Sequence, residues 1–485
     1  MIITRWLCEK CSKKWIYPVE KCVYCKGSIT KQKGTKLKVA GMTKVFISSP
    51  MHPIVPYNIL LLQDEHGNRQ PKKTMKDYKI GDSYVEQKAT SEDAVSIVKV
   101  KYDIYEAICD SLDLLKDAGI KKSDKILIKP SIVLPAYPYQ AVNTNPEFLN
   151  ALLMVMLDYG IKKENIMVAE QALIGSDSMD AAVKSGILDV CKKNGVSFVD
   201  IHKGHFEEID VDGYKMSIFK EALKRKVINC PVMKTNFQLG ISGALENLSR
   251  LAEEKTQRKM YFDDIEKTLP MLIKSIPDVI NIADATNGLQ GQGPLFLGEP
   301  AFLNLVLASK SAAALDIAFC DIAMIPLPNS VIMSSNGLDA KKIEIVGNDP
   351  EALKYRLKQP IPDETAHSDI KLIDARACPA CINAMNSLTS KLIGVRGEQI
   401  WLVTGHMINE GMLEGKKRLV ALGECAIKRL DSLQIKDAAR ISEDMEEIEQ
   451  ILLLKKLLMT SGIPKITPVD KVKTKMKKLL YRVSR

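Results

Sequence analysis

The first 25 residues of this chain contain four cysteines in two pairs, Cys8 with Cys11 and Cys22 with Cys25. Each pair is a CxxC motif, and ten residues separate the two motifs. This spacing can bring four thiolates around one ion at tetrahedral angles, the geometry that zinc prefers. A single iron could take the same place, whereas disulfides are not expected because nothing else in the sequence indicates secretion. The motifs therefore predict a zinc ribbon over residues 1–34, a closed metal site with no open position for catalysis.

The composition bounds the class of protein. A chain of 485 residues, 46% of them hydrophobic, has room for about three or four domains. No apolar stretch precedes the ribbon, so we expect no secretory signal. We also expect no transmembrane span, because Asp316 and Asp321 interrupt the most apolar helical run. Eleven cysteines in a chain without a signal indicate a cytoplasmic location.

The net charge of +10 is concentrated at the two ends of the chain. Residues 464–485 carry eight Lys or Arg against Asp470 alone, and the middle of the chain is slightly acidic. Nucleic-acid binding is therefore not expected of the whole protein. In residues 464–485, basic residues alternate with apolar residues that fall at helical spacing. This pattern predicts a helix that lies on an anionic membrane surface, docks on an acidic partner or packs on its own protein.

Residues 35–90 contain short strand patterns separated by glycine-containing turns, which is typical of a small OB-type β-barrel. The two CxxC motifs, residues 15–18 and residues 80–82 together resemble the domain-of-unknown-function family 35, in which a rubredoxin-like ribbon precedes an OB fold. The chain has Ser12 and Lys26 where a glycine usually follows each CxxC motif. The resemblance implies association with acyl-CoA and with a thiolase-type partner enzyme.

Strand and helix patterns alternate from residue 93 onward. Continuous apolar strands separated by helices predict a parallel sheet covered on both faces. The predicted fold is therefore α/β and multidomain. Its parts are the zinc ribbon, the OB-type barrel, a large mostly parallel α/β domain over residues 93–330, a second α/β segment over residues 331–430, and a helical basic tail over residues 431–485.

Polar residues follow the predicted strands of the large domain. In parallel α/β sheets, ligands bind just beyond the carboxyl ends of the strands. A cleft that gathers lysines, carboxylates and a glycine-rich loop would suit an anionic ligand. The residues expected at these ends are Lys129, Glu170, Lys234, Asp284, Gly291 and Gly293.

These segments, in this order, resemble the domain-of-unknown-function family 362 over about residues 93–330. Its members are frequently iron–sulfur proteins of anaerobes, and the family has no agreed general reaction. The chain departs from the family pattern at Ser131, Asn236 and Glu246, where Asn, His and Lys are usual. The matching segments are residues 127–130, 144–146, 233–235, 243–248 and 284–294, so the substrate-binding residues expected here are Lys129, Thr144, Lys234, Asn247, Gly291 and Gly293.

A second candidate metal site lies near the C-terminus. Cys378 and Cys381 form another CxxC motif, and Cys425 follows an apolar strand. Three thiolates can hold a 4Fe–4S cluster and leave one iron open for substrate or for a fourth ligand. His406, just past a predicted strand, could complete an iron or a zinc site. A redox dithiol and plain buried cysteines are the alternatives.

Two functions fit these patterns. The first is an oxygen-sensitive iron–sulfur enzyme of anaerobic metabolism, acting on an anionic substrate such as an acyl thioester, with Glu170 or Asp284 moving a proton. A redox partner would then be expected. The second is an acyl-CoA-associated scaffold without catalysis, which docks a thiolase-type enzyme. Iron in the purified protein would favour the enzyme, and a stable complex without iron would favour the scaffold.

Overall fold

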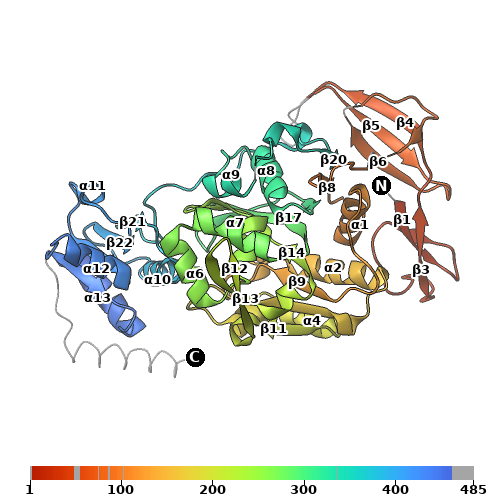
Figure 1. Cartoon of the computed structure of the whole chain (residues 1–485). Helices are drawn as coiled ribbons and strands as arrows, with labels where there is room; N and C mark the ends of the chain where they lie inside the picture. The colour runs from red at the N-terminus through yellow and green to blue at the C-terminus, as the bar shows by residue number, and fades with distance from the viewer. Residues whose placement is uncertain are drawn as a thin grey trace.

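The structure is a computed structural model, and it describes residues 3–47, 55–74, 76–85, 88–101, 103–335 and 337–460. The chain is elongated: two small β-sheets lie at one end, a C-terminal α/β domain lies at the other, and a large central domain lies between them (Figure 1). No helix among the described residues combines the length and the apolar character that a membrane crossing needs. The basic stretch at residues 464–485 lies outside the described residues.

The predicted ribbon forms a three-stranded antiparallel sheet with the order β2-β1-β3. A second antiparallel sheet follows, with four strands in the order β6-β5-β4-β7, at the place of the expected OB-type barrel. We call the part that contains β4 to β7 the small β-domain. Ile3 of the ribbon packs in the same apolar cluster as Leu37, Leu60 and Leu62, so the two sheets share a core. The strands are β1 Ile3–Cys8, β2 Lys14–Trp15, β3 Ile29–Gly34, β4 Leu37–Val45, β5 Tyr57–Gln63, β6 Arg69–Thr74 and β7 Ser83–Tyr84.

The central domain is built on a large mixed sheet, whose main path runs β11-β10-β9-β14-β17-β19-β8-β20. The strands from β11 to β17 on this path are parallel, and β19 is antiparallel to both of its neighbours. The parallel half agrees with the predicted fold class. The strands are β8 Val95–Lys99, β9 Ile126–Pro130, β10 Ile166–Glu170, β11 Ser197–Asp200, β14 Lys226–Cys230, β15 Val232–Asn236, β16 Gly240–Ser242, β17 Val279–Gly291, β18 Gly298–Ala301, β19 Leu305–Ser309 and β20 Ile345–Gly347, beside a separate hairpin of β12 Phe206–Val211 and β13 Tyr214–Phe219.

Helices cover both faces of this sheet, because alternate residues of each strand point to opposite sides. On β9, Leu127 packs in one apolar cluster, and Ile126 and Ile128 pack in the other. The first cluster joins the sheet to helices α5 to α9, and the second joins it to α1 to α4. The helices are α1 Ile104–Leu114, α2 Pro146–Asp158, α3 Ser178–Lys184, α4 Ile187–Asn194, α5 Ala244–Ser249, α6 Glu254–Asp263, α7 Ile265–Ser275, α8 Ala312–Ala323 and α9 Asn329–Ser334.

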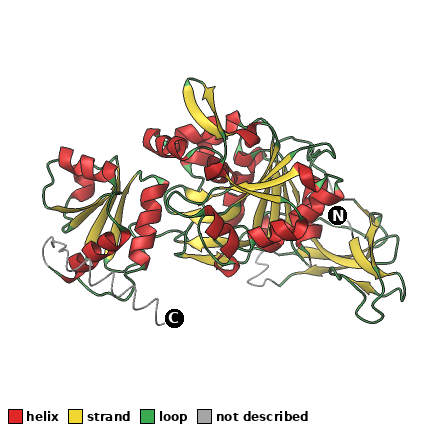
Figure 2. Cartoon of the chain, turned by 90° about the horizontal axis from the view of Figure 1, so that it is seen from below, coloured by secondary structure: helices red, strands yellow, loops and turns green. Residues whose placement is uncertain are grey.

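The C-terminal domain is a smaller sheet of four parallel strands in the sequential order β21-β22-β23-β24. Helices α10 and α13 pack on one face, and α11 and α12 pack on the other, so the strands lie between two helical layers (Figure 2). Its elements are β21 Ile370–Ala375, α10 Pro379–Ser390, β22 Ile400–Gly405, α11 Glu410–Leu413, β23 Leu419–Leu422, α12 Glu424–Ser432, β24 Ala438–Ile441 and α13 Glu447–Met459.

Three features differ from the sequence-based expectation. Strand β20 pairs with β8, so the central domain extends past the expected boundary at residue 330. Strand β24 belongs to the C-terminal sheet and helix α13 packs on that sheet. Residues 438–459 are therefore part of the C-terminal domain and not of a separate tail. Strand β17 continues to Gly291, because β15 and β18 pair with the segment that was expected to be a glycine-rich loop.

Candidate functional site

The four cysteines of the ribbon converge. The sulfur atoms of Cys8, Cys11, Cys22 and Cys25 all lie within 4.8 Å of one another. Four thiols at this separation form a complete tetrahedral donor set, so the group can hold a metal ion such as Zn²⁺. All four positions would then be filled by protein, which suits a structural metal.

The turn after each CxxC motif explains why glycine is usual there. Ser12 and Lys26 both have a φ of 58°, in the left-handed region that residues with a Cβ rarely adopt. Their N–H groups donate to the carbonyl oxygens of Cys8 and Cys22, each over 2.9 Å. The chain therefore keeps the same turn as a glycine would make, at some cost in backbone strain.

The carboxyl ends of β9 and β10 carry a buried ion pair. Lys129 Nζ lies 2.6 Å from Glu170 Oε2, and the two side chains are 0% and 1% exposed. Burial raises the pKa of Glu170 to about 7, although the charges of Lys129 and Arg250 oppose this shift. Burial likewise lowers the pKa of Lys129. A carboxyl group with a pKa near neutrality is suited to proton transfer.

Lys234 on β15 lies in the same region. Its Nζ donates to the carbonyl oxygen of Val142 over 2.5 Å and to the Ser131 hydroxyl over 3.3 Å. Both partners are neutral, and burial lowers the pKa of Lys234 to about 7. Ser131, one of the departures from the family pattern, thus contacts one of the expected ligand-binding lysines.

Two further residues join this centre that the sequence analysis did not select. Arg250 is 7% exposed, its Nη2 lies 3.9 Å from Glu246 Oε1, and its Nη1 has no hydrogen-bond partner in the described part of the chain. Gln171 donates to the carbonyl oxygens of Arg250 and Ala252, and its own Oε1 lacks a partner there. The one sequence signal for this contact is the i,i+4 spacing between Glu246 in α5 and Arg250, the residue that caps the end of that helix. We call Lys129, Glu170, Gln171, Lys234 and Arg250 the polar centre.

The remaining predicted site residues hold the surrounding loops in place. Thr144 accepts a hydrogen bond from the Ser131 N–H over 2.7 Å and donates to the Cys230 carbonyl. Asp284 accepts from the Asn145 N–H over 2.9 Å and from the Thr286 hydroxyl over 2.6 Å. Burial raises the pKa of Asp284. Asn247, in α5, donates to Asn229 and to the Lys129 carbonyl.

The two glycines expected to cradle an anion use their N–H groups internally. Gly291 donates to the Lys358 carbonyl, and Gly293 donates to the Gly291 carbonyl, each over 2.8 Å. A Cβ on Gly293 would stand 2.2 Å from the Thr235 carbonyl oxygen, so this position requires glycine for close packing. An anion at this segment would have to displace existing hydrogen bonds.

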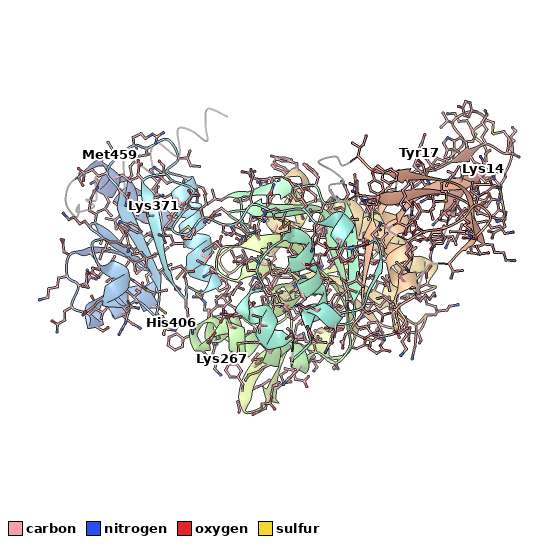
Figure 3. The ribbon with its side chains drawn as sticks, turned by 90° about the horizontal axis from the view of Figure 1, so that it is seen from above. Lys14, Tyr17, Lys267, Lys371, His406 and Met459 are labelled. Atoms are coloured by element: carbon pink, nitrogen blue, oxygen red, sulfur yellow. The ribbon has the colours of Figure 1, made fainter. Side chains whose placement is uncertain are left out.

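The C-terminal cysteines line one cavity of about 250 Å³. Cys378 follows β21, His406 follows β22, and Cys425 follows β23, while Cys381 lies in the first turn of α10. Helix α6 of the central domain closes the cavity from the opposite side. Figure 3 shows His406 at the edge of the C-terminal domain that borders the central domain. We call this cavity the thiol pocket; it is lined by Cys378, Cys381, Cys425, His406, Arg258, Lys259, Phe262, Arg376, Gly405 and Glu443.

Positive charge surrounds the thiols. Cys378 is the N-cap of α10, and a hydrogen bond with Cys381, together with backbone N–H groups and Arg258, lowers its pKa to about 6. Arg258 also pairs with Glu254 at 3.1 Å and with Glu443 at 3.3 Å. The pocket therefore favours the thiolate form of Cys378.

Burial favours the neutral forms of His406 and Cys425. Burial lowers the pKa of His406, whose ring stacks on Phe262 with 4.4 Å between centroids. Burial raises the pKa of Cys425. Among the described residues, the ribbon is the one group of His, Cys, Asp or Glu whose ligand atoms all lie within 4.8 Å. Cys378, Cys381 and Cys425 do not form such a group, although the Cys378 and Cys381 thiols lie within hydrogen-bonding reach of each other.

The two carboxyl edges of the two sheets face one another. Val133 and Leu173, in the loops after β9 and β10, share an apolar cluster with Cys381 and Ile382 of α10. Asn383 donates to the Ile174 carbonyl and to the Ser176 hydroxyl, each over 3.0 Å. The thiol pocket and the loops above the polar centre thus belong to one region.

A second cavity, of about 620 Å³, also lies between the central domain and the C-terminal domain. Arg258, Cys381 and Glu443 line both this cavity and the thiol pocket. Burial raises the pKa of Tyr261, and the charges of Glu246 and Arg250 on one side and of Cys378 on the other also act on it. The two cavities therefore adjoin, and residues of both domains line them.

Comparison with known proteins places the central domain. Residues 126–321 match the family described as "Domain of unknown function (DUF362)". A thylakoid-associated protein of Synechocystis sp., sll1697, is 24% identical over 237 residues, which cover 47% of this chain and 72% of that protein.

A solved structure described as "Ltp2-ChsH2(DUF35) aldolase" is also similar, with 15% identity and a TM-score of 0.14. The match covers 16% of this chain and 66% of that one, just under two thirds of its length. The match of residues 126–321 to the family of unknown function 362 agrees with the resemblance that the strand-end motifs predict.

Proposed function

We propose that this protein is an iron–sulfur and zinc enzyme, with a 4Fe–4S cluster in the thiol pocket and an anionic substrate bound between the two facing sheet edges. One observation carries the proposal. Three cysteines that are separated by up to 47 positions along the chain line a single cavity with His406 at the carboxyl edge of a parallel sheet. Such edges are where α/β proteins place their ligands.

The donor set fits the cluster. Cys378, Cys381 and Cys425 would hold three irons, and His406 would stand near the fourth. A cluster held by three thiolates carries net negative charge, which Arg258, Lys259 and Arg376 along the pocket would offset. When bound, the cluster would supply an electron relay or an open Lewis-acidic iron.

The polar centre supports an anionic substrate. Lys129, Lys234 and Arg250 are three buried cations, against the two carboxylates Glu170 and Glu246. The Nη1 of Arg250 lacks a partner in the part of the chain that the structure describes, and a buried donor of this kind is usually satisfied by a ligand or water. We assign substrate binding to these cations, with Thr144, Asn247, Gly291 and Gly293 shaping the surrounding loops, and proton transfer to Glu170 or Asp284.

The resemblance to family 35 extends the proposal to an acyl thioester as substrate. Under the same resemblance, the ribbon and the small β-domain would contact a thiolase-type partner. The alternative function is a scaffold that docks such an enzyme without catalysis of its own. Arg250 favours the enzyme, because its buried Nη1 has no partner among the described residues and a scaffold has no need for such a buried cation at a sheet edge.

The test is metal analysis of the full chain purified without oxygen. We expect about one zinc with about four irons and four sulfides per chain. Cys425→Ala should lose iron and sulfide while zinc stays, and Cys109→Ala, outside the thiol pocket, should keep all three. Zinc without iron after anaerobic reconstitution would rule out the cluster and leave the scaffold as the better function.

A further inference from the structure

A separate cavity of about 270 Å³ lies between the small β-domain and the central domain, at the opposite end of the molecule from the thiol pocket (Figure 1). Strands β5 and β6 form one wall. The other wall comes from the end of β8 and from residues 348–353, which follow β20. We call it the seam cavity.

The strand register explains which side chains reach the seam cavity. Strands β5 and β6 pair so that Ile59 lies opposite Lys73 and Leu60 lies opposite Lys72. Leu60 points into the core of the small β-domain, so Ile59 and Lys73 point the other way, toward the central domain. The face of strands β5 and β6 that points away from the core of the small β-domain is therefore one wall of the seam cavity.

The seam cavity combines an apolar floor with a basic rim. Ile59, Pro71, Ala352 and Leu353 supply the apolar surface. The rim carries Lys73, Lys99 and Lys101, against the single carboxylate of Asp349. An apolar pocket with a few convergent charged groups is the usual form of a small-molecule site.

Like charges are held close together at this rim. Burial lowers the pKa of Lys73, and the charge of Lys99 lowers it further, while Asp349 acts in the opposite direction. Lys73 Nζ also lies 4.1 Å from the centre of the Tyr57 ring. A bound anion would relieve the repulsion between the two ammonium groups, and the Tyr57 ring offers a flat surface beside them.

The surroundings extend the basic side. An adjoining cavity of about 250 Å³ shares Lys73 and Thr74 and adds Lys72 and Lys76. The acidic groups near Lys99 and Lys101, which are Asp103, Glu106 and Asp110, line a different cavity of about 20 Å³. Lys99 and Lys101 line that space too, so these carboxylates offset part of their positive charge, whereas Lys73 does not line it.

We propose that the seam cavity binds a phosphorylated small molecule with a flat apolar group, of the size of a nucleoside monophosphate. The phosphate would lie on Lys73 and Lys99, and the flat group would lie among Tyr57, Ile59 and Leu353. Lysine side chains bind phosphate as point charges, and Tyr57 and the aliphatic floor suit a planar ring. This site is independent of the thiol pocket and of any cluster bound there.

The test is calorimetric titration of the full chain, purified without oxygen, with AMP, adenosine and inorganic phosphate in turn. AMP should bind at least about tenfold more tightly than either part alone, since two charge-assisted contacts and the apolar contacts act together. Lys73→Gln and Lys99→Gln should each weaken AMP binding by about tenfold. Lys38→Gln, on the exposed side of β4, is the matched control and should bind as the parent does.

A second measurement does not depend on the variants folding. AMP should protect Lys73 and Lys99 of the unmodified protein from acetylation, as read by mass spectrometry, and leave Lys38 equally reactive. AMP that binds no more tightly than adenosine and phosphate, or that Lys38→Gln weakens as much as Lys73→Gln does, would overturn the proposal. Equal acetylation of Lys73 and Lys99 with and without AMP would do the same.

Discussion

Lys129 Nζ and Glu170 Oε2 lie 2.6 Å apart on neighbouring parallel strands, and both side chains are almost completely removed from solvent. The pair lies among further charged groups, since Lys234 and Arg250 are also buried. Burying such a cluster costs free energy, because each charged group loses its hydration. Its presence at a sheet edge therefore points to a use beyond stability.

Glu170→Gln should destabilise the protein by about 3–5 kcal/mol, because it leaves the charge of Lys129 buried without its partner. Adding Lys129→Met to Glu170→Gln should restore part of that loss, since the uncompensated charge is then removed. Urea unfolding followed by circular dichroism measures both. Glu208→Gln, in an exposed pair with Lys215, is the control and should change stability far less. Equal effects at the two pairs would contradict the buried position of Lys129.

Lys234 should make the free energy of unfolding depend on pH between about pH 7 and pH 10. Its pKa is about 7 in the folded protein, against about 10.4 in an unfolded chain. Below pH 7 both states carry the proton, so the full desolvation penalty of the charged lysine is present. As pH rises from about 7 toward 10, the folded state releases its proton first and the penalty is relieved.

Lys234→Met should therefore stabilise the protein relative to the parent most below pH 7, and this advantage should shrink as pH rises toward 10. Unfolding free energies at several pH values measure the difference. Lys342→Met, at an exposed lysine, should give a difference that does not change with pH in this way. A constant difference for Lys234→Met would show that Lys234 titrates normally.

Cys22→Ser should unfold the ribbon without disturbing the thiol pocket. Cys22 is fully buried among the ribbon thiols, and loss of one thiolate weakens a structural zinc site strongly. We expect zinc to fall and trypsin to cut within residues 3–34, with the iron content unchanged. Loss of iron together with zinc would contradict two separate metal sites.

The sequence predicted features that local spacing determines. Two CxxC motifs specify the ribbon because the ligands lie close along the chain, and the apolar runs at residues 125–129 and 226–230 indicated buried parallel strands. The facing of the two sheet edges depends on contacts between distant residues, such as Arg258 with Glu443. Nothing in the local sequence reports such a contact. Strand β17 runs through its glycines because pairing with neighbouring strands overrides their weak strand propensity.

Gly423 tests the cluster without removing a ligand. It precedes α12 with a φ of +88°, and a Cβ there would stand 2.5 Å from Cys381 Sγ. Gly423→Ala should therefore displace Cys381 and lower the iron content several-fold, while zinc in the ribbon stays.

The matched control is Gly415→Ala. Gly415 has a φ of +70°, but a Cβ there meets nothing within 4 Å. Gly423 combines its positive φ with a ψ of 154°, a conformation that is essentially restricted to glycine, so Gly423→Ala also carries the larger backbone strain of the two substitutions. Gly423→Ala alone adds a clash with a proposed iron ligand, so the iron contents are compared once circular dichroism has shown that both variants keep the parent's fold. Equal iron in both would mean that Cys381 does not hold the cluster.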